Sequence, residues 1–201
     1  MNNIYVGIDP SINSTGICIK YKNIIEFYII KGGMHLTKRE INASDSLPNF
    51  NYICYDKLTT NNDNHINEYN KTKNFINIIE IIKDILHKKI LCDNSLDINN
   101  IYIIMEGISY GSASRTKAIF DLAGLNYIIR YALTKYGYNV IICTPSEIKK
   151  FATGNGNCKK DIIENIFLTV FPEYKTLPKI DDIADAYMMM LYGEKNIGDI
   201  S

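Results

Sequence analysis

The sequence predicts a single α/β domain on a mixed five-stranded sheet, with the first three strands antiparallel, the later ones parallel, and helices on both faces. Three β-rich segments follow one another near the N-terminus. After them, helical and strand patterns alternate, which is typical of right-handed parallel crossovers. The chain has 201 residues, of which 46% are hydrophobic, so one domain with a substantial core is expected over residues 1–201.

The first two strands form a predicted hairpin over residues 4–20. Ile4, Val6 and Ile8 alternate with other residues in a β-branched run, and Pro10 ends the strand because it has no N–H to donate. Turn residues precede a second apolar run at 17–19. Asp9 closes the first strand, where a carboxylate faces either water, as a turn cap, or a cation.

The third strand is predicted at 24–30 and ends before a glycine pair. Residues 34–67 are rich in Asn, Asp, Ser and Thr and are interpreted as an irregular insertion, with a strand candidate at 51–55. Apolar positions then recur every three or four residues over 68–89, which indicates an amphipathic helix.

The fourth strand is the continuous apolar run 101–105, as expected of a strand buried on both faces, and it ends at Glu106. A helix is predicted over 112–135. Arg115 and Lys117 lie in its first turn, where positive charge opposes the helix dipole. These two side chains therefore either bind an anionic partner or are exposed to solvent at the start of the helix.

A fifth strand is predicted at 139–143, followed by a short helix that begins around Pro145. The segment 149–160 then places a Gly-Asn-Gly turn between two lysine pairs, formed by Lys149, Lys150, Lys159 and Lys160. Such a turn can bind phosphate or can be a solvated loop. The Gly-x-x-x-x-Gly-Lys-Ser/Thr pattern of a P-loop is absent.

The final helix is predicted to begin near Ile180 and carries a group of acidic residues. Asp182 and Asp185 are three residues apart and share one face of that helix. Asp181 is interpreted as a cap of the helix dipole. Asp185 lies in an apolar setting, where a carboxylate requires a cation.

This order of elements predicts that Asp9 and Glu106 lie close together at the ends of adjacent strands, and the last helix can bring Asp182 and Asp185 to them. Four convergent carboxylates repel one another unless divalent cations lie between them. Oxygen-only ligands indicate Mg²⁺ or Mn²⁺. Two such ions can activate water and stabilise the leaving oxygen in phosphodiester cleavage.

Four motifs in this order resemble those of the RuvC-type Holliday junction resolvases of the RNase H-like superfamily, and in particular those of viral and phage members. The motifs are GIDPSINSTG at 7–16, IIMEG at 103–107, KKFATGNGNCKK at 149–160 and DDIADA at 181–186. The resemblance implies an RNase H-like fold in which Asp9, Glu106, Asp182 and Asp185 are the catalytic ligands of two Mg²⁺ ions, with Mn²⁺ as a substitute. It also implies a homodimer that nicks a four-way DNA junction symmetrically, with the four lysines along the phosphates.

Two features depart from the family pattern: Ser11 stands where the family often has Gly, and residues 34–67 lie outside the resemblance. Alternatives within the enzyme class are a flap or branched-DNA nuclease, and an RNase H that acts on RNA–DNA hybrids. A non-catalytic DNA-binding relative is a further alternative. A sugar-kinase or actin-like ATPase would need a second domain, which 201 residues do not accommodate.

Composition limits the remaining classes. Acidic and basic residues number 22 each, so DNA binding requires a local basic patch. No apolar run approaches the roughly 20 residues of a membrane span, and no signal-peptide pattern is present. Five scattered cysteines without a CxxC pair fit reduced thiols. We expect a soluble intracellular protein, in the cytoplasm of a bacterium or of a virus- or phage-infected cell, with no membrane partner and no small-molecule cofactor.

Overall fold

The computed structural model describes residues 3–59, 63–92, 96–108 and 117–198. The strands are β1 (Ile4–Asp9), β2 (Ser14–Tyr21), β3 (Ile24–Gly32), β4 (Phe50–Tyr55), β5 (Ile101–Glu106) and β6 (Asn139–Cys143). The α-helices are α1 (Lys38–Ser46), α2 (Asn64–Cys92), α3 (Lys117–Lys135), α4 (Pro145–Thr153), α5 (Lys160–Val170) and α6 (Ile180–Gly198). Short 3-10 helices occupy η1 (Ile98–Asn100) and η2 (Pro172–Thr176).

The six strands form one sheet in the order β4-β3-β2-β1-β5-β6. β1, β2 and β3 pair antiparallel, while β5 pairs parallel with β1 and β6 parallel with β5, as the sequence predicts. The prediction of five strands is wrong, because β4 joins the sheet in parallel with β3. Helix α1 connects these two strands, so residues 34–67 are more regular than the sequence indicated.

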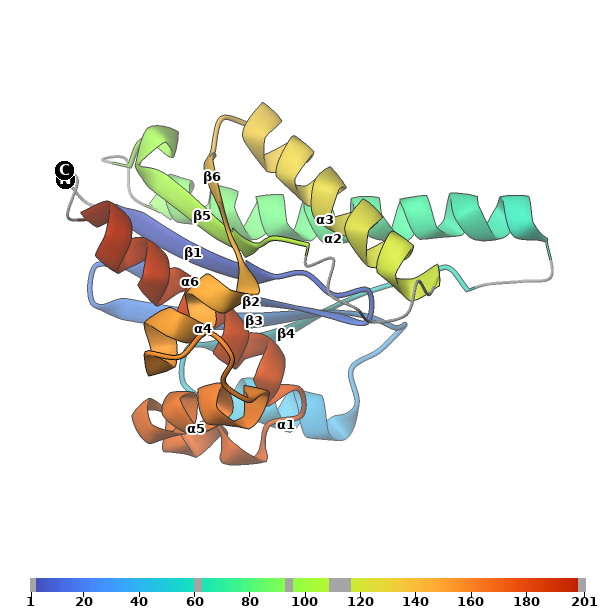
Figure 1. Cartoon of the computed structure of the whole chain (residues 1–201). Helices are drawn as coiled ribbons and strands as arrows, with labels where there is room; N and C mark the ends of the chain where they lie inside the picture. The colour runs from blue at the N-terminus through green and yellow to red at the C-terminus, as the bar shows by residue number, and fades with distance from the viewer. Residues whose placement is uncertain (1–2, 60–62, 93–95, 109–116, 199–201) are drawn as a thin grey trace.

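Helices cover both faces of the sheet (Figure 1). α2 and α3 pack on one face, where Ile78, Ile82 and Ile129 meet the isoleucines of β1 and β5. α4, α5 and α6 pack on the other face, around Phe27, Phe167 and the methionines of α6. The N-terminal half of α2 extends beyond the sheet (Figure 1). Among the described helices, none combines the length and the hydrophobicity that crossing a membrane requires.

Helix α6 lies directly against the backbone of β1 and β2. A Cβ atom on Gly7 would lie 1.8 Å from the carbonyl oxygen of Ala186, and one on Gly16 would lie 2.2 Å from that of Asp182. Contacts below 3 Å are not tolerated between such atoms. The two glycines therefore let the acidic first turns of α6 approach the end of β1.

Helix α4 begins as its sequence predicts. Thr144 and Glu147 form a capping box, and Pro145 stands in the first turn. The first residues of the helix predicted at 112–135 lie outside the described residues, and the part that is described begins at Lys117. Helix α2 is longer than the predicted 68–89 at both ends.

Candidate active site at the sheet edge

Asp9 and Glu106 lie at the carboxyl ends of two neighbouring parallel strands. The register pairs Ile8 of β1 with Met105 of β5, so the two acidic residues follow at adjacent positions. Both are partly buried. The carboxyl ends of β3, β4 and β6 reach the same edge, because all of these strands run parallel to β1.

Helix α6 brings two further carboxylates to this edge. Asp182 is buried, at 7% exposure, and Asp185 is one helical turn further along. The hydroxyl of Ser14 donates a hydrogen bond to Oδ2 of Asp182. Asp182 is therefore attached to the start of β2, whereas Asp185 faces the basic side of the site.

The pKa of Asp9 responds to the charges of the other three carboxyl groups. Burial raises the pKa of Asp9 well above its ordinary range, and the charges of Asp185, Asp182 and Glu106 raise it further. Burial, followed by the charge of Asp185, also raises the pKa of Glu106. Like charges in a poorly solvated site disfavour joint ionisation, so the group stays partly protonated unless a cation neutralises it.

The pKa values of the two α6 carboxyls are raised mainly by burial. That of Asp182 reaches about 6, although the hydrogen bond from Ser14 acts in the opposite direction. That of Asp185 is also raised by burial, while Lys160 lowers it. Both side chains are therefore sensitive to any positive charge placed beside them.

Lys160 supplies positive charge to this site. Its Nζ lies 3.1 Å from Oδ2 of Asp181 and 3.2 Å from Oδ2 of Asp185. Burial alone would lower the pKa of Lys160, but the Asp185 and Asp181 carboxylates raise it. Asp181, which the sequence suggested was only a helix cap, therefore also pairs with a lysine.

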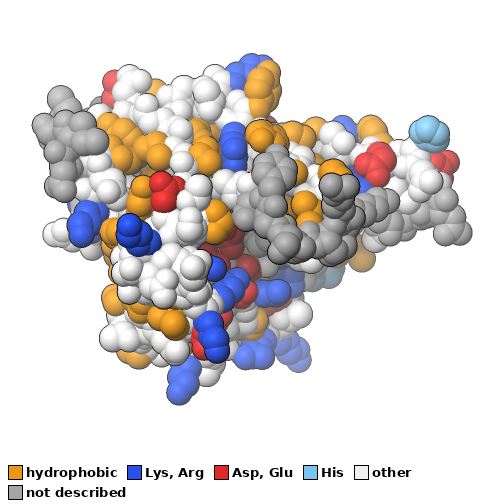
Figure 2. All heavy atoms as spheres, in the orientation of Figure 1, with side chains coloured by type: hydrophobic (Ala, Val, Ile, Leu, Met, Phe, Trp, Pro, Cys, Tyr) orange, Lys and Arg blue, Asp and Glu red, His pale blue; other side chains and the backbone are white. Residues whose placement is uncertain are grey.

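A small cavity of about 210 Å³ lies between Glu106, Lys149, Lys160 and Asp185. The charges of Lys149 and Lys160 oppose the rise in the pKa of Glu106. Lys150 and Lys159 are exposed on α4 and at the N-cap of α5. Figure 2 shows acidic side chains in a recess of this face with Lys and Arg side chains along its lower side.

The Gly-Asn-Gly turn uses most of its backbone N–H groups internally. Gly154 donates to Lys150, Asn155 to the Thr153 hydroxyl, and Asn157 and Cys158 to oxygens of Asn155. Gly154 adopts the left-handed conformation with a φ of 77° that ends α4. The lysine side chains are therefore the groups of this segment best placed to bind phosphate.

Two predicted DNA-binding residues precede or begin α3. Arg115 lies outside the described residues, and Lys117 is the first residue of the helix, with its side chain not described. Sequence reasoning missed Ser14 and Asn126, and it placed Arg130 only in the basic face; the side chains of Asn126 and Arg130 donate to the carbonyl oxygen of Glu106 at 3.1 Å and 3.3 Å. No local pattern marks these contacts, since the partners are distant in sequence.

The residues present fit a hard divalent cation in their chemistry, since the four acidic side chains and Ser14 offer only oxygen ligands. Their positions are looser than a bound ion requires: across the described ranges, no three His, Cys, Asp or Glu side chains are close enough to hold a metal ion. The ammonium of Lys160 is already paired with Asp185, one of these carboxylates. Binding of a cation would draw the carboxylates together and compete with Lys160.

No family model and no curated protein matches the sequence. Among solved structures, "Thermus thermophilus RuvC structure" matches with a TM-score of 0.57 at 14% identity, covering 97% of this chain and 96% of that one. "T. thermophilus RuvC in complex with Holliday junction substrate" matches with a TM-score of 0.55 at 12% identity over the same shares. The yeast mitochondrial Holliday junction resolvase Ydc2 gives a TM-score of 0.45 at 14% identity, covering 92% of this chain and 75% of that one. The chain therefore has a RuvC-like fold, with Asp9, Glu106, Asp182 and Asp185 at one edge of its sheet.

Proposed function

We propose that the protein is a metal-dependent endonuclease that resolves four-way DNA junctions by paired, symmetric phosphodiester nicks. The observation that carries the proposal is the electrostatic coupling of Asp9 to Glu106, Asp182 and Asp185 at the carboxyl edge of a RuvC-like sheet. All four positions that the sequence motifs single out meet there. That the chain belongs with the viral or phage members stays a prediction from the motifs.

The carboxylates would hold two Mg²⁺ ions, or Mn²⁺ in their place. When bound, these ions supply a water-derived nucleophile and stabilise the leaving oxygen. Asp9 and Glu106 present their oxygens from the rigid ends of β1 and β5. Asp182 is fixed by Ser14, and Asp185 can exchange its ion pair with Lys160 for a cation.

The lysines would neutralise the phosphates on either side of the scissile bond. Lys149 and Lys160 already reach the acidic site, and an ammonium released from Asp185 can stabilise charge that develops on the phosphate. Lys150 and Lys159 extend the positive charge along α4 and α5, and the sequence predicts that Arg115 and Lys117 also bind DNA. This patch provides the local basic surface that a chain of zero net charge requires.

A homodimer would place two such sites on one junction. The described part of α3 exposes three aromatic side chains on one face, because residues 7 and 11 positions apart lie on the same side of a helix. These are Phe120 at 68% exposure, Tyr127 at 55% and Tyr131 at 67%. We propose this stripe as the contact between the two copies, since large apolar patches of this kind mark interfaces.

Cleavage of defined substrates tests the function. A synthetic four-way junction, a flap, a plain duplex and an RNA–DNA hybrid would each be incubated with Mg²⁺, with Mn²⁺ and with chelator. The proposal expects paired symmetric nicks in the junction that require the metal. Equal cutting of flap or hybrid would support metal-dependent cleavage but contradict the proposed specificity for junctions. Binding without cutting would indicate a non-catalytic relative.

A further inference from the structure

A second cavity lies at the same edge of the sheet as the acidic site but on the opposite face. Its volume is about 450 Å³, within the range of about 300–1,000 Å³ typical of ligand sites. The β1–β2 turn, the segment after β4 and the helices α2 and α3 form its walls. We call it the α2 cavity, and its lining includes Ile12, Lys57, Leu58, Thr59, Asn70 and Phe75.

The walls of the α2 cavity combine an apolar slot with polar groups. Ile12 and Leu58 provide aliphatic surface, and Phe75, which is 7% exposed, adds a small aromatic surface. Thr59 and Asn70 provide a hydroxyl and an amide, which match the hydrogen-bonding edges of nucleobases. An unstacked base requires apolar side chains against its flat faces and hydrogen-bonding groups, such as amides, at its edge.

The wall formed by residues 57–59 is held in place by α2. The buried side chain of Asn74 binds both polar backbone groups of Leu58, accepting at 2.9 Å and donating at 3.0 Å. Asn70 donates to the carbonyl oxygen of Thr59 at 2.8 Å. The cavity is therefore formed before any ligand binds, which reduces the entropy lost on binding.

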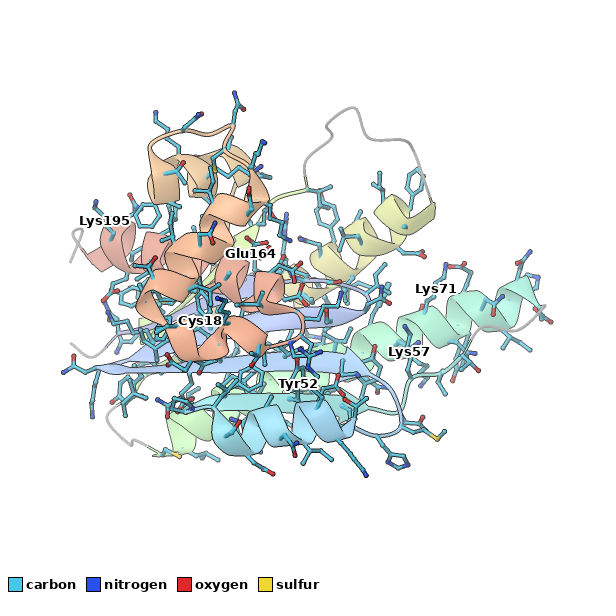
Figure 3. All side chains as sticks on the ribbon, turned by 90° about the horizontal axis from the view of Figure 1, so that it is seen from below. Cys18, Tyr52, Lys57, Lys71, Glu164 and Lys195 are labelled. Atoms are coloured by element: carbon cyan, nitrogen blue, oxygen red, sulfur yellow. The ribbon has the colours of Figure 1, made fainter. Side chains whose placement is uncertain are left out.

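The charges at the cavity connect it to the acidic site. Lys57 and Lys71 both line it and lie near one another in Figure 3. Lys71 is fixed by Asp121 at 2.9 Å and Glu68 at 2.8 Å. Lys57 reaches to 3.5 Å from Oδ1 of Asn13, in the turn that follows Asp9. A cation of the α2 cavity thus contacts the turn that follows the strand carrying Asp9.

We propose that the α2 cavity binds one unstacked nucleotide of the DNA substrate, with the base between Ile12, Leu58 and Phe75 and a phosphate on Lys57. The inference depends on the proposed function, because it assumes that a DNA strand crosses the adjacent acidic site. It gives a role to the segment after β4, which the sequence motifs leave unassigned.

Abasic scanning tests this site. Junctions that lack a single base at each position near the crossover would be titrated with the wild-type chain in chelator, so that binding is measured without cleavage. We expect one position at which loss of the base weakens binding about fivefold or more, the effect of one lost base–aromatic contact. In Thr59→Trp, whose indole fills the cavity, that position should no longer differ from the others.

Thr169→Trp is the matched control, because Thr169 is another exposed threonine, on α5, and should preserve the wild-type pattern. Leu58→Ala, which removes one wall, is a second variant and should also abolish the positional effect. An identical abasic profile in wild type, Thr59→Trp and Leu58→Ala would overturn the inference while leaving the nuclease proposal intact. Failure of the wild-type chain to bind any junction would instead overturn the proposed function.

Discussion

Ser14 donates its hydroxyl hydrogen bond to Oδ2 of Asp182 and thereby joins the start of β2 to the first turn of α6. Both side chains are buried, at 5% and 7% exposure. A hydroxyl that donates favours the ionised carboxylate, so Ser14 opposes the rise in the pKa of Asp182 that burial causes. The contact uses Oδ2 of Asp182, so Oδ1 can bind a cation. Because Ser14 belongs to β2, the sheet sets the orientation of the Asp182 carboxylate.

The first prediction concerns loss of this hydrogen bond. In Ser14→Ala the pKa of Asp182 should rise further, because a hydrogen bond to a charged group contributes about 1.5–3 kcal/mol, equivalent to about one pKa unit or more. If Asp182 must be ionised for cleavage, its protonation then lowers the rate at higher pH values than in the wild type. The acid limb of the pH–rate profile should therefore shift to higher pH. Ser11→Ala, in the neighbouring turn, is the control and should keep the wild-type profile. An acid limb unchanged in Ser14→Ala would refute the role given to Ser14.

The second prediction concerns the dependence of stability on pH in chelator. The pKa of Asp182 is raised in the folded protein from about 3.8 to about 6. The folded state therefore binds its proton more tightly than the unfolded state does, and this stabilisation is complete below about pH 4 and is lost as the pH rises through 6. The difference is up to roughly 3 kcal/mol.

Denaturant unfolding at a series of pH values measures the effect. The free energy of unfolding should fall between pH 4 and pH 6.5, and the fall should be smaller in Asp182→Asn. Addition of Mn²⁺ at pH 7 should restore stability, because a ligand of the folded state stabilises it. Identical pH curves for the wild type and Asp182→Asn would contradict the assignment.

The third prediction separates catalysis from binding. Asp9→Asn or Glu106→Gln should reduce cleavage by about a hundredfold or more, because each removes a charge that a catalytic cation requires. Junction binding should persist, since neither residue supplies positive charge. Glu164→Gln on α5 is the control and should cleave normally. Full activity in either site variant would remove that residue from the metal site.

Local patterns predicted most of the sheet. The β-branched run of β1, the continuous apolar run of β5 and the strand at 139–143 lie where the sequence indicated. The candidate strand at 51–55 exists as β4, but its pairing with β3 could not be derived from the sequence, because parallel pairing depends on a crossover. That crossover is α1. Its sequence is too polar to indicate a helix by hydrophobic periodicity, although Thr37 and Glu40 form a capping box at its start.

The candidate site was predicted as a set of residues and not as a set of contacts. The spacing of Asp182 and Asp185 placed them on one helical face, and strand order placed Asp9 beside Glu106. The attachment of Asp182 to Ser14 connects residues 168 positions apart, for which sequence carries no signal. The pairing of Lys160 with Asp181 and Asp185 likewise depends on how α5 packs against α6. The roles of these residues stay predictions.

The fourth prediction concerns the lysines at the start of α5. Lys159→Ala combined with Lys160→Ala should weaken junction binding and reduce the slope of log K against log salt by about two, since each phosphate contact contributes about 0.9. The control pair is Lys88→Ala with Lys89→Ala, at the end of α2, where Lys89 pairs with Glu26 at the start of β3. A salt slope equal to that of the wild type would exclude the α5 lysines from the DNA contact.

The fifth prediction concerns the exposed face of α3. Tyr127→Glu combined with Tyr131→Glu places two charges in the aromatic stripe, so a dimer that buries this stripe should dissociate. Sedimentation should show a monomer, and junction nicks should become single and uncoupled because each monomer carries one acidic site. Tyr69→Glu, at a similarly exposed tyrosine on α2, should leave the dimer intact. A variant that remains dimeric with paired nicks would place the contact between copies on another surface, because two buried like charges would prevent association through α3.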